Sequence, residues 1–269
     1  ISCSLVGSEM CIRDRYKGAT TATGEAAWGY DNLVDFDATA KCYSFAAYSD
    51  GGILGKGSGL LTGATARFTP GTGGTTTPND ATLTINNYTT ADNKDLVVSF
   101  SRNTLTAENS TVDFRFKHAL AQVKFTIMSA MGINKVDITE FNVENFLEGG
   151  NLTYTKGTSH ETDNISWSNV GNGTSQKKAI NALDEGMNVA TTDKPACGTY
   201  VVIPQEFPAG GINVTLKAVL YKEDGNGGTT PVERELKATI QNGTGENKID
   251  FQAGYIYNFI ATLDGSDFG

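Results

Sequence analysis

The stretch that most constrains this sequence runs from Thr111 to Met128 and reads TVDFRFKHALAQVKFTIM. Alternating apolar residues indicate an extended strand with one buried face, because successive side chains on a strand point to opposite sides. The apolar parity changes inside the run: the first series is Val112, Phe114, Phe116, His118 and Leu120, and the second is Ala119, Ala121, Val123, Phe125 and Ile127. No Gly or Pro interrupts it. We therefore expect an extended passage between two β-domains, with the crossing point at Lys117 to Ala121.

The composition is that of an all-β protein with long polar loops. A length of 269 residues favours two domains, and the 31 Gly and abundant Thr and Asn favour strands joined by turns. No apolar run approaches the roughly 20 residues of a membrane-spanning helix. The net charge is −9, and Lys177-Lys178 is the only basic pair. Nucleic acid is therefore not expected as a partner.

The first fifteen residues, ISCSLVGSEMCIRDR, resemble translated sequencing-adaptor sequence and lack the pattern of a signal peptide. We treat 1–15 as a non-native or disordered segment, so that Cys3 and Cys11 carry no function. We then expect an N-terminal β-sandwich domain over 16–110 and a C-terminal one over 111–269. Cys42 and Cys197 fall in different domains, which favours two buried free thiols over a disulfide.

Several segments predict strands by their alternation. They are CYSFAAYS at 42–49, the runs around Leu83–Ile85 and Leu96–Phe100, LTYT at 152–155, ISWS at 165–168, TYVVIPQ at 199–205, Ile212–Leu220 and Leu236–Ile240. The turn EDGNGG at 223–228 predicts a hairpin between the last two. A parity change between Glu140 and Phe141 predicts a bulge. The fold class is therefore all-β, with two antiparallel sandwiches in tandem.

The final strand has the strongest alternation in the sequence. It is expected to run unbroken from Ile249 to Leu263, with one apolar face made by Ile249, Phe251, Ala253, Tyr255, Tyr257, Phe259, Ala261 and Leu263. Six of these form the candidate strand-exchange or core strand, namely Ile249, Phe251, Tyr255, Tyr257, Phe259 and Leu263. Such a strand can remain in its own core or complete the sheet of a neighbour.

Residues able to carry chemistry are scarce. His118 lies on an apolar parity and is expected to be a core histidine, and His160 is expected in a solvated loop. No nucleophile, metal or phosphate motif is present, so we expect no enzyme activity, no catalytic residue, no metal and no cofactor. Trp28, Tyr30 and Trp167 are a candidate glycan platform, because aromatic faces suit sugar rings, with core packing as the alternative interpretation.

Three separated segments resemble one family. They are DLVVSF followed by VDFRFKHALAQVKFTI, then YVVIPQ, then IDFQAGYIYNFIATL, and in this order they are similar to the fimbrillin-like proteins of the Bacteroidales. The resemblance covers roughly Ala38 to Leu263. It implies two transthyretin-like, Greek-key sandwiches, export as a lipid-anchored lipoprotein, and display at the cell surface on the outer membrane. It also implies assembly with other fimbrial subunits by donor-strand exchange.

The sequence departs from the family pattern at both ends. The lipid-bearing cysteine and the first native strand are absent, and only DGSDFG follows Leu263, which is too short for a separate donor strand. We therefore expect Ile249–Leu263 to stay in its own core, which favours an accessory or tip-like pilus component or adhesin over a stalk subunit, with a truncated chain as the other interpretation. A glycan-binding module of a surface polysaccharide-capture system is the alternative function, and a host or microbial protein or glycan is a further partner class.

Overall fold

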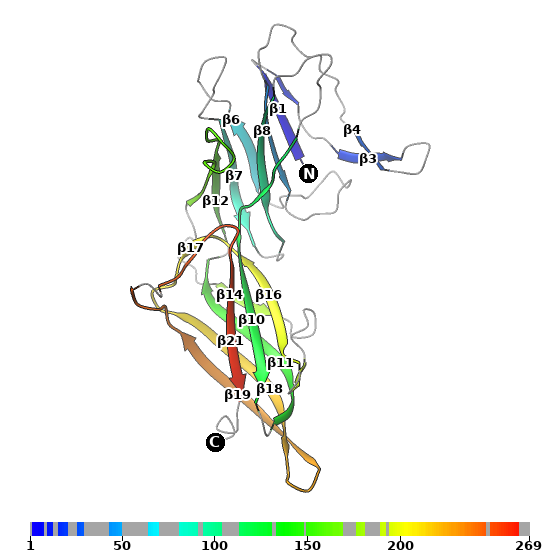
Figure 1. Cartoon of the computed structure of the whole chain (residues 1–269), viewed down its shortest axis with the longest axis vertical. Coiled ribbons are helices and arrows are strands. Elements are labelled where there is room, and N and C mark those ends of the chain that lie inside the picture. Colours follow the sequence, from blue (N-terminus) through cyan, green and yellow to red (C-terminus); the bar gives the residue numbers. More distant parts are fainter. Residues whose placement is uncertain are drawn as a thin grey trace. The chain divides into compact units, whose positions relative to one another are not determined.

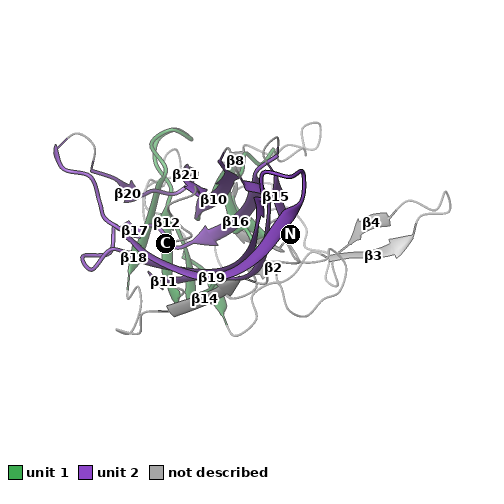
Figure 2. Ribbon diagram, turned by 90° about the horizontal axis from the view of Figure 1, so that it is seen from below, with its two compact units in different colours: residues 1–120, 149–170 green, residues 121–148, 171–269 purple. Residues whose placement is uncertain are grey.

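The computed structural model describes residues 2–7, 10–12, 16–20, 26–29, 43–49, 64–69, 81–90, 94–103, 113–130, 133–147, 149–168, 176–180, 189–191, 194–245 and 248–263. Every regular element within these ranges is a β-strand, which confirms the all-β prediction. The chain divides into two compact units, shown in separate colours in Figure 2. Unit 1 comprises Ile1–Leu120 and Gly149–Val170, and unit 2 comprises Ala121–Glu148 and Gly171–Gly269.

The units divide the chain at positions other than the expected segments 16–110 and 111–269. The first passage lies between Leu120 and Ala121, inside the predicted crossing point, and 149–170 then returns to unit 1. The reason is strand pairing: β12 (Gly149–Thr155) pairs with β13 (Asn164–Ser168) on one side and with β7 (Thr82–Thr89) on the other. A hairpin inserted late in the sequence thus completes a sheet begun much earlier.

Unit 1 contains two main sheets. The first has the order β2-β1-β5-β8-β9 and the second the order β13-β12-β7-β6. The strands not yet introduced are β1 (Ser2–Gly7), β2 (Met10–Ile12), β5 (Tyr43–Ser49), β6 (Thr65–Thr69), β8 (Val97–Asn103) and β9 (Lys117–His118), with β3 (Tyr16–Thr20) and β4 (Ala26–Gly29) forming a separate pair. Phe100 and Tyr154 join the two sheets through rings 4.7 Å apart. β1 and β2 lie within the segment 1–15, and the expectation that this segment is non-native or disordered stays a prediction.

Unit 2 is a sandwich of two sheets. One has the order β16-β10-β21, from β10 (Ala121–Ser129), β16 (Ala196–Val202) and β21 (Ile256–Leu263). The other has the order β14-β11-β18-β19, with β15 also on β11; the strands are β11 (Ile133–Phe146), β14 (Gln176–Ile180), β15 (Val189–Thr191), β18 (Ile212–Glu223) and β19 (Thr229–Ile240). Phe125 of β10 contacts Phe141 of β11 with ring centroids 5.2 Å apart, at the centre of a core cluster that both sheets supply.

The predicted unbroken strand Ile249–Leu263 is instead two strands. β20 (Asp250–Phe251) pairs with β17 (Gln205–Glu206), and β21 pairs with β10 in parallel, which departs from the purely antiparallel expectation. Between them Gly254 has a φ of +79°, which L-residues rarely adopt. Alternation alone did not reveal this break because the turn preserves the parity of the apolar residues on either side.

The predicted irregularity in β11 and the predicted hairpin are both confirmed. Along β18, Ile138 lies opposite Ala218 and Glu140 opposite Lys217, so Thr139 is the extra residue of a bulge. β18 and β19 form one long antiparallel hairpin. The Asp224 carboxylate closes its turn, because Oδ1 accepts hydrogen bonds from the backbone N–H groups of Asn226 and Gly228 at 2.8 and 3.0 Å.

The parity change near Ala119 separates two strands. β9 pairs with β8 in unit 1, and two residues separate the end of β9 from the start of β10, with which unit 2 begins. The expectation that His118 is a core histidine is wrong: its side chain is 64% exposed, and Nδ1 lies 2.5 Å from Asp95 Oδ2. Among the described strands β9 is the last of its sheet, so apolar neighbours at two-residue spacing do not place a side chain in the core there.

Cys197 is a free, half-buried thiol on β16, and its Sγ atom donates to Thr126 Oγ1 at 3.7 Å. This agrees with the expected free thiol on a strand. Cys42, its proposed counterpart in the first domain, lies outside the described residues.

Candidate strand-addition site

The first half of the candidate strand is anchored in unit 2. Phe251 is 2% exposed, and its ring contacts Phe146, Phe207 and Tyr257 at centroid distances of 5.3, 5.7 and 4.9 Å. Ile249 packs against the same core. β20 is therefore a core element as well as a short sheet partner of β17.

The second half of the candidate strand, β21, is fixed by side-chain contacts of Tyr257 and Phe259. Tyr257 Oη donates to the Asp250 carbonyl at 2.6 Å and accepts from the Gln252 N–H at 2.9 Å, which ties β21 to β20. Phe259 stacks on Phe125 at 5.4 Å, and Leu263 is buried. Five of the six candidate residues thus pack in or against the core.

Tyr255 is the exception among the six. Its side chain is 60% exposed, because the turn at Gly254 ends just before it and its residue precedes β21. Its backbone N–H donates to Gln252 in the same turn at 3.2 Å. The alternation that grouped Tyr255 with Tyr257 predicted a strand position where the chain is still turning.

Two residues that the sequence interpretation missed lie on the other parity of β21. Ile256 and Ile260 are 67% and 61% exposed, the highest values among the large apolar side chains that the structure describes. Their presence on the outward parity was visible in the sequence, since a solvated strand face ordinarily carries polar residues. The outer face of β21 is therefore more apolar than a solvated face requires.

β21 also ends its sheet. Among the described strands it has a neighbour on one side only, β10 (Figure 1). The Gln122 N–H donates to the Tyr255 carbonyl at 2.9 Å, and the Ala130 N–H donates to the Leu263 carbonyl at 2.9 Å. In a parallel ladder the residues of one parity direct both backbone groups to the same neighbour. The even-numbered residues of β21 therefore direct theirs away from β10.

A second sheet position relevant to strand addition lies in unit 1. β1 runs antiparallel to β5 over five residue pairs, from Ser2 opposite Tyr48 to Val6 opposite Ser44. β5 contributes Phe45, Ala46 and Ala47 to the buried core, at 7%, 1% and 0% exposure. The N-terminal segment thus supplies the backbone partner of a core strand.

The candidate glycan platform is only partly within the described side chains. Trp28 lies in β4, whose side chains are not described, and Tyr30 lies outside the described residues. Trp167 is half-buried in β13: its ring lies 5.8 Å from that of Tyr88, and Nε1 donates to the Ala119 carbonyl at 2.9 Å. These contacts are the core-packing arrangement, and the platform itself stays a prediction.

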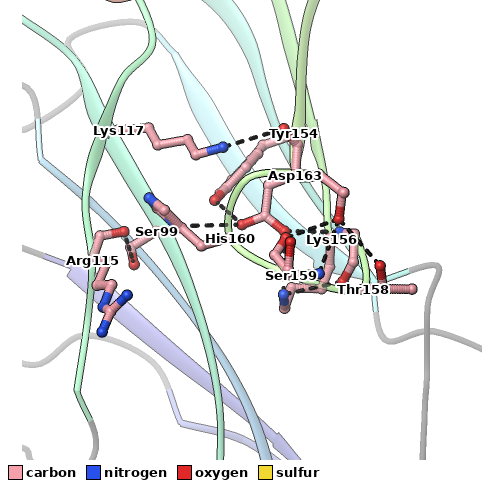
Figure 3. A network of polar contacts seen from close by, with 11 residues as sticks. Ser99, Arg115, Lys117, Tyr154, Lys156, Thr158, Ser159, His160 and Asp163 are labelled. Carbon is pink, nitrogen blue, oxygen red and sulfur yellow. Dashed lines mark hydrogen bonds and ion pairs between the residues drawn. The ribbon is translucent and has the colours of Figure 1, made fainter.

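A polar network surrounds Asp163 in unit 1 (Figure 3). This carboxylate, whose side chain is 1% exposed, accepts from Tyr154 Oη at 2.7 Å, the Gly157 N–H at 2.8 Å and Lys156 Nζ at 3.2 Å. His160 Nδ1 lies 3.8 Å from Asp163 Oδ2, so this histidine is less solvated than expected. The acceptor positions of the carboxylate are used within its own loop, which gives the network a structural role in holding residues 156–163.

Within the described residues, no three His, Cys, Asp or Glu side chains form a group that could hold a metal ion. The same part of the chain contains no helix long and apolar enough to cross a membrane.

Two solved structures share this fold. A fimbrial protein from Bacteroides vulgatus aligns with a TM-score of 0.54 and 14% identity, over 98% of this chain and 87% of the other. A candidate cell adhesion protein from Bacteroides uniformis aligns with a TM-score of 0.52 and 15% identity, over 98% of this chain and 86% of the other. At such identities the likeness establishes the fold alone.

The comparison of sequences is more specific. None of the curated proteins compared with this chain matches it. The family model described as fimbrillin-like matches residues 8–267, which is nearly the whole length. This match confirms the resemblance found in DLVVSF, FKHALAQVKF, YVVIPQ and GYIYNFIATL. The chain therefore belongs to the fimbrillin-like family.

Proposed function

We propose that this chain is a non-enzymatic component of a surface fibre, an accessory or tip-like fimbrial subunit or adhesin, which joins neighbouring subunits by strand addition. The observation that carries the proposal is the pairing of β1 with β5. β1 comes from the segment 1–15, which we expect to be non-native, and its backbone pairs with β5 in the sheet of unit 1. The edge of β5 that binds this segment is called the β1–β5 slot below. It is occupied through backbone hydrogen bonds.

The physical basis is the state of β5 without β1. One edge of β5 would then have unpaired N–H and C=O groups beside the buried Phe45, Ala46 and Ala47. An incoming strand would satisfy this backbone, and its alternate side chains would cover the core. At about 2 kcal/mol for each large side chain buried, a strand that inserts several of them offsets the entropy lost on ordering.

The accessory or tip-like role is supported by the carboxyl-terminal strand. Phe251, Tyr257 and Phe259 make core contacts within unit 2, so removing β21 to serve as a donor would break its own sandwich. A subunit that keeps this strand accepts a neighbour without donating in the same way. The partners are then other fimbrial subunits, and the location is the cell surface.

The proposal is tested by removing residues 1–15. We expect the shortened chain to bind a synthetic peptide with the sequence of β1, SCSLVG, and to form species with neighbouring subunits that survive SDS without heating. The full-length chain is the matched control, because β1 already occupies β5. A shortened chain that remains folded, binds no strand peptide and stays monomeric in the presence of those subunits contradicts the proposal.

A further inference from the structure

We propose that two copies of this chain associate through β21, whose edge away from β10 has no partner among the described strands and pairs antiparallel with the same edge of the second copy. The two three-stranded sheets of unit 2 would then join into one continuous sheet. This interface is distinct from the β1–β5 slot of unit 1 and does not depend on the proposed fibre function.

The two edge strands β21 and β19 of unit 2 differ in their charge and proline content. β21 reads IYNFIATL and contains no charged residue and no proline, although Ile256 and Ile260 are largely exposed. β19, the edge of the opposite sheet in unit 2, reads TTPVERELKATI and carries Pro231 and four charged residues. Charges and proline protect an edge strand from pairing with another chain. One edge of unit 2 therefore carries this protection and β21 lacks it.

The side chains of β21 are complementary to those of a second copy of β21 that runs antiparallel to it. The segment Ile256–Ile260 reads I-Y-N-F-I, with an isoleucine at each end, an aromatic residue inside each, and Asn258 at the centre. An antiparallel pair with its two-fold axis at Asn258 places Ile256 opposite Ile260 of the other copy, and Tyr257 opposite Phe259. Both the apolar outer pairs and the aromatic inner pairs are favourable cross-strand neighbours.

The backbone N–H and C=O groups of β21 also fit this register. The even-numbered residues of β21 direct their N–H and C=O groups away from β10, because the carbonyls of the odd-numbered Tyr255 and Leu263 accept hydrogen bonds from the residues that continue β10 and from β10 itself. In an antiparallel pair centred on Asn258, the even-numbered residues face each other as hydrogen-bonded pairs. The register selected by the side chains is thus also one in which every free backbone group between Ile256 and Ile260 finds a partner.

No charged side chain on β21 opposes the contact. Asn258, which lies on the axis, is held by a hydrogen bond of 2.9 Å from Thr126 Oγ1 on β10. Lys124, the residue of β10 in register with Asn258, would lie about three strand spacings, or roughly 14 Å, from its copy. That separation exceeds the Debye length of about 8 Å at physiological salt, so the repulsion is screened.

The test introduces charged residues at Ile256 and Ile260, which the predicted register places opposite each other in the two copies. Full-length wild type should sediment as a dimer at high concentration. Ile256→Glu and Ile260→Lys should each weaken dimerisation by about tenfold, because each replaces the two apolar cross-strand pairs of the dimer with a charge opposite an isoleucine. The double variant Ile256→Glu/Ile260→Lys should regain the dimer, since the carboxylate introduced in each copy then faces the ammonium group introduced in the other. An equimolar mixture of the two single variants should form a mixed dimer.

The control is Met128→Lys, which places a charge on the same sheet one strand away from the free edge, at a side chain that is 41% exposed. It should leave dimerisation unchanged. A wild type that stays monomeric up to about 1 mM overturns the proposal, as do single variants that remain dimeric. A double variant that remains monomeric while its circular dichroism matches wild type overturns the register. The shortened chain tested for the β1–β5 slot retains β21, so the two proposals fail independently.

Discussion

Tyr154 Oη donates a hydrogen bond of 2.7 Å to Asp163 Oδ2 in the interior of unit 1, where the tyrosine ring is fully buried and the carboxylate is 1% exposed. The two residues lie at opposite ends of the connection between β12 and β13. The bond therefore closes the hairpin that returns to unit 1 from a later part of the sequence. Two predictions concern this contact.

Tyr154→Phe keeps the ring and removes the donor. Because Asp163 then loses one of its partners while it stays buried, we expect the free energy of unfolding of unit 1 to fall by about 1–3 kcal/mol. Urea denaturation followed by fluorescence measures the change. Tyr255→Phe is the matched control, since that hydroxyl belongs to a side chain that is 60% exposed, and it should alter stability by less than about 0.5 kcal/mol.

The same contact predicts a dependence on alkaline pH. Burial, and then the hydrogen bond to Asp163, raise the pKa of Tyr154 far above its ordinary value. The folded state therefore keeps a proton that the unfolded state releases above about pH 10, so this contribution is complete below pH 10 and declines as pH rises further. Between pH 9 and 11 the stability of wild type should fall more steeply than that of Tyr154→Phe. Parallel slopes for the two proteins would contradict the assignment.

Gly157→Ala tests the packing of the loop that Asp163 holds. A Cβ atom at this position would lie 2.5 Å from the carbonyl carbon and oxygen of Thr162, which is too close for any real contact. We expect a loss of about 1–3 kcal/mol in thermal or chemical unfolding. Gly210→Ala serves as control, because the nearest atom to its Cβ is Asn145 Nδ2 at 4.0 Å. Equal stability of the two variants would contradict this packing.

Deletion of Thr139 tests the bulge in β11. Removing this residue reverses the parity of one half of the strand, so that either Val136 and Ile138 or Phe141 and Val143 face solvent. At about 2 kcal/mol for each large side chain, we expect a loss of at least about 4 kcal/mol, measured by circular dichroism during heating. Thr139→Ala keeps the register and removes only a bond of 3.1 Å to the Lys217 carbonyl. It should cost about 0.5–1.5 kcal/mol.

Phe125→Ala tests the centre of unit 2. The Phe125 ring contacts Phe141, Tyr200 and Phe259, and its residue is 3% exposed. The cavity left behind should lower the free energy of unfolding by about 3–5 kcal/mol. Met128→Ala on the exposed face of the same strand should change it by less than about 0.5 kcal/mol. A small effect at Phe125 would mean that the two sheets do not depend on this contact.

Strands that bury one face were predictable because their alternation is local. Leu83 and Ile85 in β7, the hairpin of β18 and β19, and the bulge beside Glu140 were all visible in the sequence. The passage near Ala119 was visible for the same reason, since a change of parity marks either a bulge or a passage from one core to another. Where a strand lies at the edge of its sheet, as at His118 and Ile256, alternation indicates a face but not whether anything covers it.

The sequence by itself determined the class of fold, the crossing between the two units and membership of the fimbrillin-like family, because parity and short family segments are properties of neighbouring residues. Only the tertiary structure decided which strands became partners. It returned 149–170 to unit 1, divided Ile249–Leu263 at Gly254, and placed β21 parallel to β10 at the end of its sheet among the described strands. Pairing joins residues far apart in the chain, and its hydrogen bonds are made by backbone groups that every residue except proline carries alike.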